Sequence, residues 1–421
     1  MLKKYFYFLL IIGSFANAQV KILFDATKVQ MAGSADWVID ADVHNLYTNN
    51  TLTTTGTESN PQRIPTPAQS TITASTPETY WNGALSHWAI DCARQGYTVE
   101  TLPWNGRITY GDATNTQDLS NYKVFIVDEP NILFTAIEKN AIVNFVKFGG
   151  GLMMIADHTI SDRNNDGSDS LMIWNDLMTS NTVQNNPFGI SFDAIDISQT
   201  TTSVANLPTN PILHGPPAPT TCAVCGNVTQ AKWSNGTTMT LNTTANSSAT
   251  GLIYKSGSST TGTTNVMCAS AIYQAGKVVA VGDSSIPDDG TGDPNDTLYD
   301  GYITDAAGNH QKFLMNATIW LATNSTMKND DFETSLSSLR IAPNPITNKE
   351  VKLYFNNATN LDSEFTIYDT TGRLVKQLHF SDSNWQNQFQ SIDCQGLNSG
   401  LYFGKFQIGA ASKTITFSIL N

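Results

Sequence analysis

The segment from Val124 to Trp174 constrains the fold more than any other part of the chain. Its first apolar run ends in Asp128, and a glycine triplet precedes a second apolar run at 152–156. Residues 135–148 between them predict a helix, because Thr135 and Glu138 form a capping-box pattern and apolar residues recur at helical spacing. A strand, a helix and a strand in this order predict a right-handed crossover in a parallel sheet.

Further strand and helix patterns extend this unit on both sides. Apolar runs at 20–26, 97–102 and 276–282 predict strands, and helical spacing predicts helices at 81–96 and at about 310–323. Residues 180–275 hold short strand-like pieces between Thr- and Ser-rich loops, without a clear periodicity. We therefore expect residues 19–325 to form an α/β domain with a doubly wound, mostly parallel sheet.

The end of the chain has a different pattern. After a polar linker, predicted at residues 326–338, alternating apolar and polar positions fill residues 339–421. Turn signals at Thr371-Gly372 and Ser399-Gly400 separate these strand patterns. We expect this segment to form a small antiparallel β-sandwich.

The beginning of the chain predicts export. Residues 1–18 read as a signal peptide, because Lys3 and Lys4 precede an apolar core and Ala16-Asn17-Ala18 gives a cleavage site. No later apolar run approaches the roughly 20 residues that a membrane helix needs. The formal net charge of −13 would repel nucleic acid. We expect an exported protein with no membrane span and no nucleic-acid partner.

Cys222 and Cys225 form a Cys-x-x-Cys pair among five cysteines. A zinc site of this type needs a second such pair, which the sequence lacks. Export also favours oxidation. We predict a local disulfide between these two residues, with zinc binding as the alternative.

Ionisable residues follow four of the predicted strands. In open α/β sheets, ligands bind beyond the carboxyl ends of the strands. The residues at these ends are Asp25, Asp128, Glu129, Asp157, His158 and Asp283. Because converging carboxylates repel one another, we expect either a bound cation or a carboxyl group that stays protonated.

Two kinds of chemistry suit such a set of residues. One is a catalytic divalent metal, held by Asp and His, that activates water. The other is a pair of carboxyl groups that cleaves a glycosidic bond. The predicted catalytic residues are Glu129, Asp157, His158 and Asp283. The predicted substrate-binding residues are Asp25, Asp128, Trp37 and His310. The alternative for each acid is a structural role at a helix cap or in a loop.

An acid-rich loop follows Asp157 and His158, and it resembles the calcium loops of EF-hand and dockerin domains. Oxygen-bearing side chains occupy its first, third and fifth positions, and Gly167 occupies the sixth. The twelfth position is Ile173, so the usual bidentate carboxylate is missing. The predicted Ca²⁺ ligands are Asp162, Asn164, Asp166, Ser168 and Asp169. A solvated turn rich in Asp and Asn is the alternative.

The last 85 or so residues resemble the C-terminal sorting domain of type IX secretion substrates of the Bacteroidetes. Four motifs carry this resemblance in the expected order, and a lysine-containing terminal strand follows them. The motifs are Ala342-Pro343-Asn344-Pro345, Ile367-Tyr368-Asp369, Thr371-Gly372-Arg373 and Leu397–Tyr402. The resemblance implies a β-sandwich, recognition by the type IX secretion machinery, and a secreted or cell-surface location.

The larger unit resembles the class I glutamine amidotransferase-like superfamily, including its ThuA-like branch, over roughly residues 20–322. The resemblance rests on four stretches: Phe24–Thr27, Arg94–Pro103, Asp118–Tyr122 and Phe145–His158. It implies a flavodoxin-like α/β fold. The amidotransferases of that superfamily carry a nucleophilic cysteine after a strand, where this chain has Asp157 and His158. Glutamine hydrolysis by a thiol is therefore not expected.

These features together predict a secreted hydrolase of an extracellular polymer, with polysaccharide as the favoured substrate. The carboxyl groups and His158 at the strand ends would cleave the glycosidic bond, with or without metal assistance, and bound calcium would be structural. One alternative is a surface module that binds glycan or protein without catalysis. Another is a glycan esterase or deacetylase.

Overall fold

The computed structural model describes residues 19–32, 35–40, 47–48, 51–52, 68–290, 300–323, 339–354, 363–380, 389–408 and 411–420. The predicted signal peptide and linker lie outside these residues. The chain divides into two compact units, Met1–Thr323 and Asn324–Asn421. Each unit is described by itself.

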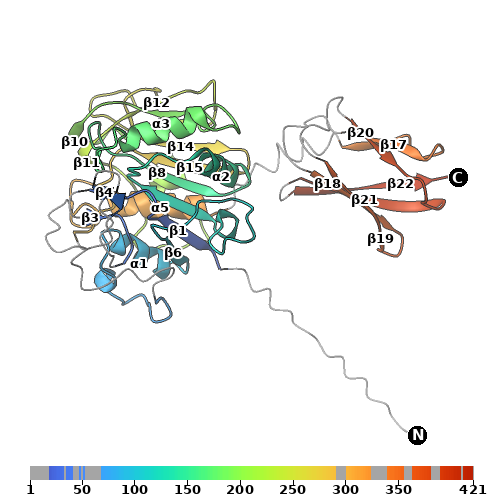
Figure 1. The fold of residues 1–421 in the computed structure, drawn as a ribbon, viewed down its shortest axis with the longest axis horizontal. Helices are drawn as coiled ribbons and strands as arrows, with labels where there is room; N and C mark the ends of the chain where they lie inside the picture. Colours follow the sequence, from blue (N-terminus) through green and yellow to red (C-terminus); the bar gives the residue numbers. More distant parts are fainter. Residues whose placement is uncertain are drawn as a thin grey trace, which may run out of the picture. The chain divides into compact units, whose positions relative to one another are not determined.

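A nine-stranded sheet forms the centre of the first unit (Figure 1). Five neighbouring strands are parallel, in the order β6 (Thr98–Leu102), β1 (Lys21–Asp25), β7 (Val124–Asp128), β8 (Gly151–Ile155) and β15 (Gly276–Val281). Every residue of β7, β8 and β15 is buried, as expected for parallel strands at the middle of a covered sheet. The predicted strands therefore exist, and their carboxyl ends share one edge.

The other four strands make the sheet mixed rather than mostly parallel. They come from the region without clear periodicity and pair antiparallel: β9 (Ile190–Phe192), β12 (Met239–Leu241), β13 (Thr250–Tyr254) and β14 (Val266–Tyr273). A tight turn at Gln274 and Ala275 joins β14 to β15. So short a connection can join only antiparallel strands, which is why the sheet changes direction there.

Short elements surround the main sheet. A separate two-stranded ribbon pairs β10 (Ile197–Thr201) with β11 (Ala231–Gly236). Two-residue strands form two further small pairs, β2 (Met31–Ala32) with β3 (Ala35–Asp36) and β4 (Tyr47–Thr48) with β5 (Thr51–Leu52). Single 3₁₀ turns occur at η1 (Glu78–Tyr80) and η2 (Leu119–Asn121).

The helices pack in two groups. Helix α1 (Ser86–Arg94) contacts α5 (His310–Ala322), which also contacts β7, β8, β15 and the short α4 (Pro211–His214). Helix α2 (Ala136–Lys147) contacts β8, β15 and α3 (Ser170–Ser180). The predicted capping box of Thr135 and Glu138 is present at the start of α2. The doubly wound arrangement remains a prediction.

The cysteine prediction is confirmed. Cys222 and Cys225 form a disulfide with a Cα–Cα distance of 5.4 Å. Cys92, Cys268 and Cys394 are free and buried.

The second unit consists of two antiparallel sheets. One contains β16 (Arg340–Ala342), β17 (Glu350–Tyr354) and β20 (Phe389–Asp393). The other contains β19 (Leu374–Phe380), β18 (Ser363–Asp369), β21 (Gly400–Ile408) and β22 (Ala411–Ile419). Leu353 of the first sheet and Phe365 and Phe406 of the second belong to one buried cluster. The two sheets therefore share a core, as a small sandwich requires.

Gly276 provides a test of the packing between α2 and the sheet. A Cβ atom at this position would collide with the backbone carbonyl oxygens of Val146 and Gly150. We expect Gly276→Ala to lower the free energy of unfolding by about 1–3 kcal/mol, because backbone atoms cannot move aside cheaply. Gly262→Ala is the control, since the nearest atom to its added Cβ lies 3.9 Å away. Equal stability of the two variants in denaturant titrations would contradict this packing.

Candidate active site at the carboxyl edge of the sheet

Glu129 follows β7 and is completely buried. Its Oε2 accepts hydrogen bonds from the Trp37 indole at 2.9 Å and from the Ser284 hydroxyl at 2.7 Å. Its Oε1 accepts a hydrogen bond from Arg163 Nε at 2.8 Å. Its backbone φ of 39° lies in the left-handed region, which residues other than glycine rarely adopt. Three hydrogen bonds therefore hold the Glu129 carboxyl group in place, and the backbone of this residue adopts an unusual conformation.

Arg163 joins Glu129 to Asp157. While its Nε donates to Glu129, its Nη2 donates to Asp157 Oδ2 at 2.6 Å. Because one guanidinium edge contacts both groups, the carboxyl groups that follow neighbouring strands β7 and β8 lie close together. Asn131 supports the Arg163 loop by accepting from the Arg163 amide at 3.4 Å and from the Asn164 side chain at 2.6 Å. Sequence reasoning did not select Arg163, although it is the single basic residue of the acid-rich loop.

Asp157 is 3% exposed, whereas the neighbouring His158 is partly accessible. Burial, followed by repulsion from Glu129 and Asp283, raises the pKa of Asp157 well above its ordinary value, and Arg163 opposes this shift. His158 Nδ1 lies 2.6 Å from the Thr159 carbonyl oxygen, which can only accept, so Nδ1 carries a proton. His158 Nε2 lies 3.6 Å from Asp157 Oδ2. In the neutral imidazole, Nε2 is therefore a proton acceptor next to an acid whose raised pKa favours the protonated form.

Asp283 and Asp128 add two further buried carboxyl groups to those of Glu129 and Asp157. Burial raises the pKa of Asp283 to about 7, although the Ser285 hydroxyl and the Ser234 amide donate hydrogen bonds to its carboxyl group. Burial, and then Glu129, Asp283 and Asp288, raise the pKa of Asp128 well above its ordinary value. Neither carboxyl oxygen of Asp128 has a hydrogen bond of good geometry within the described residues. The Glu129 amide lowers the pKa of Asp128, but less than burial raises it.

Protonation therefore relieves part of the repulsion among these acids. Among the described residues, no three His, Cys, Asp or Glu side chains are arranged to hold a metal ion. Binding of a catalytic metal remains a prediction, because other oxygen donors such as backbone carbonyl groups also bind metal ions.

The structure buries all four predicted substrate-binding residues, including Asp128 at 2% exposure. The Asp25 carboxyl group accepts hydrogen bonds from Thr27 and Gln30 in the loop that follows β1. Burial raises the pKa of Asp25 to about 6. His310 is 2% exposed, and both its ring nitrogens bond to backbone groups. Trp37 is 1% exposed and donates to Glu129. In this conformation, these side chains support the fold and offer no surface to a substrate.

The predicted calcium loop is held by its own hydrogen bonds. The two carboxyl oxygens of Asp162 accept the amides of Asp166 and Gly167 at 3.1 and 2.7 Å. Asp166 accepts the Ser168 amide at 2.9 Å. Asp169 caps α3 by accepting the Met172 amide at 3.2 Å. These contacts also suit a turn rich in Asp and Asn without an ion, so calcium binding remains a prediction.

Replacing Arg163 tests its role as the bridge. Arg163→Met leaves two buried carboxyl groups without their cation, which we expect to cost about 3 kcal/mol of unfolding free energy at pH 8. The loss should be smaller at pH 5, because Asp157, whose pKa is raised, then accepts a proton more readily. Arg107→Met removes an exposed ion pair with Asp112 and should cost less than about 1 kcal/mol. Equal, pH-independent losses in both variants would show that the bridge contributes nothing specific.

Asp128 predicts an unusual pH dependence of stability. In the unfolded chain its carboxyl group ionises near the ordinary value of 3.8, whereas in the folded chain it keeps its proton to higher pH. Its contribution to stability therefore falls as the pH rises above about 4, by up to roughly 1.4 kcal/mol per pH unit. We expect Asp128→Asn to melt at a higher temperature than wild type at pH 8 and near the wild-type value at pH 5. Asp112→Asn, at an exposed position, is the control. A wild-type advantage at pH 8 would contradict the buried, protonated state.

Residues 340–420 match the sequence model of the secretion system C-terminal sorting domain. This confirms the predicted type IX sorting domain, and it indicates delivery to the cell surface or the extracellular space. In the part of the chain that the structure describes, no helix is long and apolar enough to cross a membrane.

Similar solved structures give no further identification. PorZ, a surface component of the type IX secretion system of Porphyromonas gingivalis, is 21% identical over 24% of this chain and 13% of its own, with a TM-score of 0.18. The mmIFT52 N-terminal domain is 13% identical over 72% of this chain and 98% of its own, with a TM-score of 0.39. Neither TM-score is high enough to support a fold or a function for the first unit. No curated protein matches the chain.

Proposed function

We propose that the first unit is an extracellular hydrolase that cleaves glycosidic bonds of a polysaccharide. The observation that carries this proposal is the pairing of Asp157, whose pKa burial raises, with the partly accessible His158. A carboxyl group that holds its proton near neutral pH can act as a general acid. The sorting domain agrees with a substrate outside the cell.

Each residue has a distinct part in the proposed reaction. Asp157 donates its proton to the glycosidic oxygen, and His158 Nε2, 3.6 Å from Asp157 Oδ2, orients this carboxyl group. Another carboxylate of the edge, on the opposite face of the sugar ring, accepts a proton from the attacking water. Arg163 and Glu129 hold Asp157 in place through the guanidinium bridge. Asp283 adds negative potential that favours a positively charged sugar in the transition state once its carboxyl group ionises. A divalent metal, if bound, would supply an activated water instead.

Thiol chemistry fits the first unit poorly. Burial raises the thiol pKa of both Cys92 and Cys268 well above the ordinary value, so neither forms a thiolate readily. The turn after β8 carries Asp157 and His158 instead of a cysteine. We propose that the unit keeps the doubly wound, glutamine amidotransferase-like scaffold with different chemistry, and that the loop at 162–169 binds calcium for stability.

One observation favours a second candidate function. Asp128, Glu129, Asp157 and Asp283 are each at most 3% exposed, so a polymer reaches them only after a local rearrangement. A surface module that binds glycan or protein without cleaving it would need no such movement. Measured turnover separates the two candidates.

The proposal predicts the loss of catalysis without the loss of the fold. On a polysaccharide on which wild type is active, Asp157→Asn should lower the turnover rate by about 10²–10⁴-fold, because the amide cannot donate a carboxyl proton. His158→Gln should have a similar effect, and both melting temperatures should stay near the wild-type value. Asp112→Asn, in an exposed turn, should keep full activity.

The substrate is identified with a panel of soluble polysaccharides and acetylated glycans, each incubated with and without a chelator. New reducing ends indicate glycosidase activity, released acetate indicates an esterase, and loss of activity on chelation indicates a metal. Wild-type activity in both Asp157→Asn and His158→Gln, or no turnover across the panel, would contradict the assignment.

A further inference from the structure

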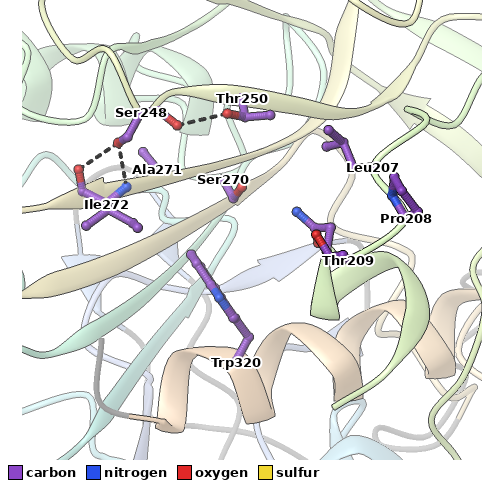
Figure 2. A pocket seen from close by; sticks show the side chains of 10 residues that line it. Leu207, Pro208, Thr209, Ser248, Thr250, Ser270, Ala271, Ile272 and Trp320 are labelled. Atoms are coloured by element: carbon purple, nitrogen blue, oxygen red, sulfur yellow. Dashed lines mark hydrogen bonds between the residues drawn. The ribbon is translucent and has the colours of Figure 1, made fainter. Parts of the chain in front are cut away.

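A hollow of about 340 Å³ lies at a different place in the first unit (Figure 2). Trp320 on α5 points its indole toward β14, where Ser270 and Ile272 form the facing wall. Thr209, just before α4, closes one side, and Asn210 also lines the hollow. Its volume lies at the lower end of the range of small-molecule sites, roughly 300–1,000 Å³.

The wall combines an aromatic surface with neutral hydrogen-bonding groups. Asn210 uses its side-chain oxygen to accept the amides of Ile212 and Leu213, which leaves its NH₂ group available to donate. The Ser270 hydroxyl and the Trp320 indole N–H also have no hydrogen-bond partner among the described residues. None of the residues that line the hollow carries an ionisable side chain.

Contacts below the hollow hold the aromatic surface in place. Lys277 Nζ lies 4.9 Å from the centroid of the Trp320 ring and donates to the Trp320 carbonyl oxygen at 2.9 Å. The contact with Lys277 thus restricts the ring before a ligand arrives, which lowers the entropy cost of binding.

This lining fits the surface of a sugar ring. One face of a pyranose presents C–H groups that pack on an indole, and its rim presents hydroxyl groups that both donate and accept. A charged ligand would lose its hydration here without forming an ion pair with any residue that lines the hollow. We propose that the hollow binds one neutral sugar residue of a glycan chain.

The sugar site is separate from the acidic edge. Ala271 of β14 pairs with Val278 of β15, and Asp283 follows the far end of β15. From residue 278 to residue 283, at about 3.3 Å per residue, the separation is roughly 16 Å. The hollow would therefore hold a polymer away from the proposed reaction. Glycan binding there does not depend on whether the first unit is an enzyme.

The test measures binding alone, by titration calorimetry of the full chain. The probes are hexasaccharides of glucose, xylose, mannose and N-acetylglucosamine, with hexagalacturonate as the charged comparison and a neutral Ser- and Thr-rich peptide as the comparison of another class. We expect at least one neutral glycan to bind and hexagalacturonate to bind more weakly. Trp320→Ala should weaken binding about tenfold, because it removes the aromatic surface. Trp104→Ala removes an exposed tryptophan outside the hollow and should not change binding.

Thr209→Val is a second test of the same site, for the case that Trp320→Ala impairs folding. Thr209 is exposed, so loss of its hydroxyl should leave the melting temperature unchanged and weaken binding about threefold. The sugar site would be ruled out if no neutral hexasaccharide binds wild type. It would equally be ruled out if Trp320→Ala and Thr209→Val both bind like wild type, or if only the peptide binds. Absence of turnover in the hydrolysis panel would contradict the proposed enzyme and leave this binding result unaffected.

Discussion

The guanidinium bridge from Arg163 to Glu129 and Asp157 is the contact on which the candidate site depends. Parallel strands bring several carboxyl groups to one edge of the sheet, and burial removes the water that would screen them. One cation cannot neutralise the whole group, so protons remain on some of its members. Burial first, and then repulsion from neighbouring acids, raises the pKa values of Asp128, Asp157 and Asp283. In the proposed reaction, Asp157 donates its proton to the substrate.

The sheet also separates two proposed tasks. The carboxyl ends of β7, β8 and β15 carry the ionisable residues, whereas the hollow next to Trp320 has a neutral lining. Strand pairing between β14 and β15 connects these places through a rigid, fully hydrogen-bonded element. A polymer could thus be held at one place and cleaved at another without a change in the fold.

The sequence predicted the features that follow from local patterns. Apolar runs ending in acids located Glu129, Asp157 and Asp283, because parallel strands put their carboxyl ends together. Short strand-like pieces were recognised in residues 180–275, but their antiparallel pairing was missed, since this region lacks a clear period. Asp25 was selected with the same logic and His310 as the first residue of the last predicted helix, but bonds to nearby side chains and backbone groups hold both inside. Arg163 was missed because the identity of a partner across the fold leaves no mark in sequence spacing.

The protonation state of Asp157 is the most direct test of the account. Carbon-13 NMR of chains labelled at aspartate carboxyl groups, with Asp157→Asn used for assignment, follows this group through a pH titration. The account predicts a titration midpoint well above the ordinary value of 3.8, with the carboxyl group still largely protonated in mildly acidic solution. A midpoint at or below 3.8 would show an ordinary ionised carboxylate at the Arg163 bridge, and Asp157 would then have no proton to donate.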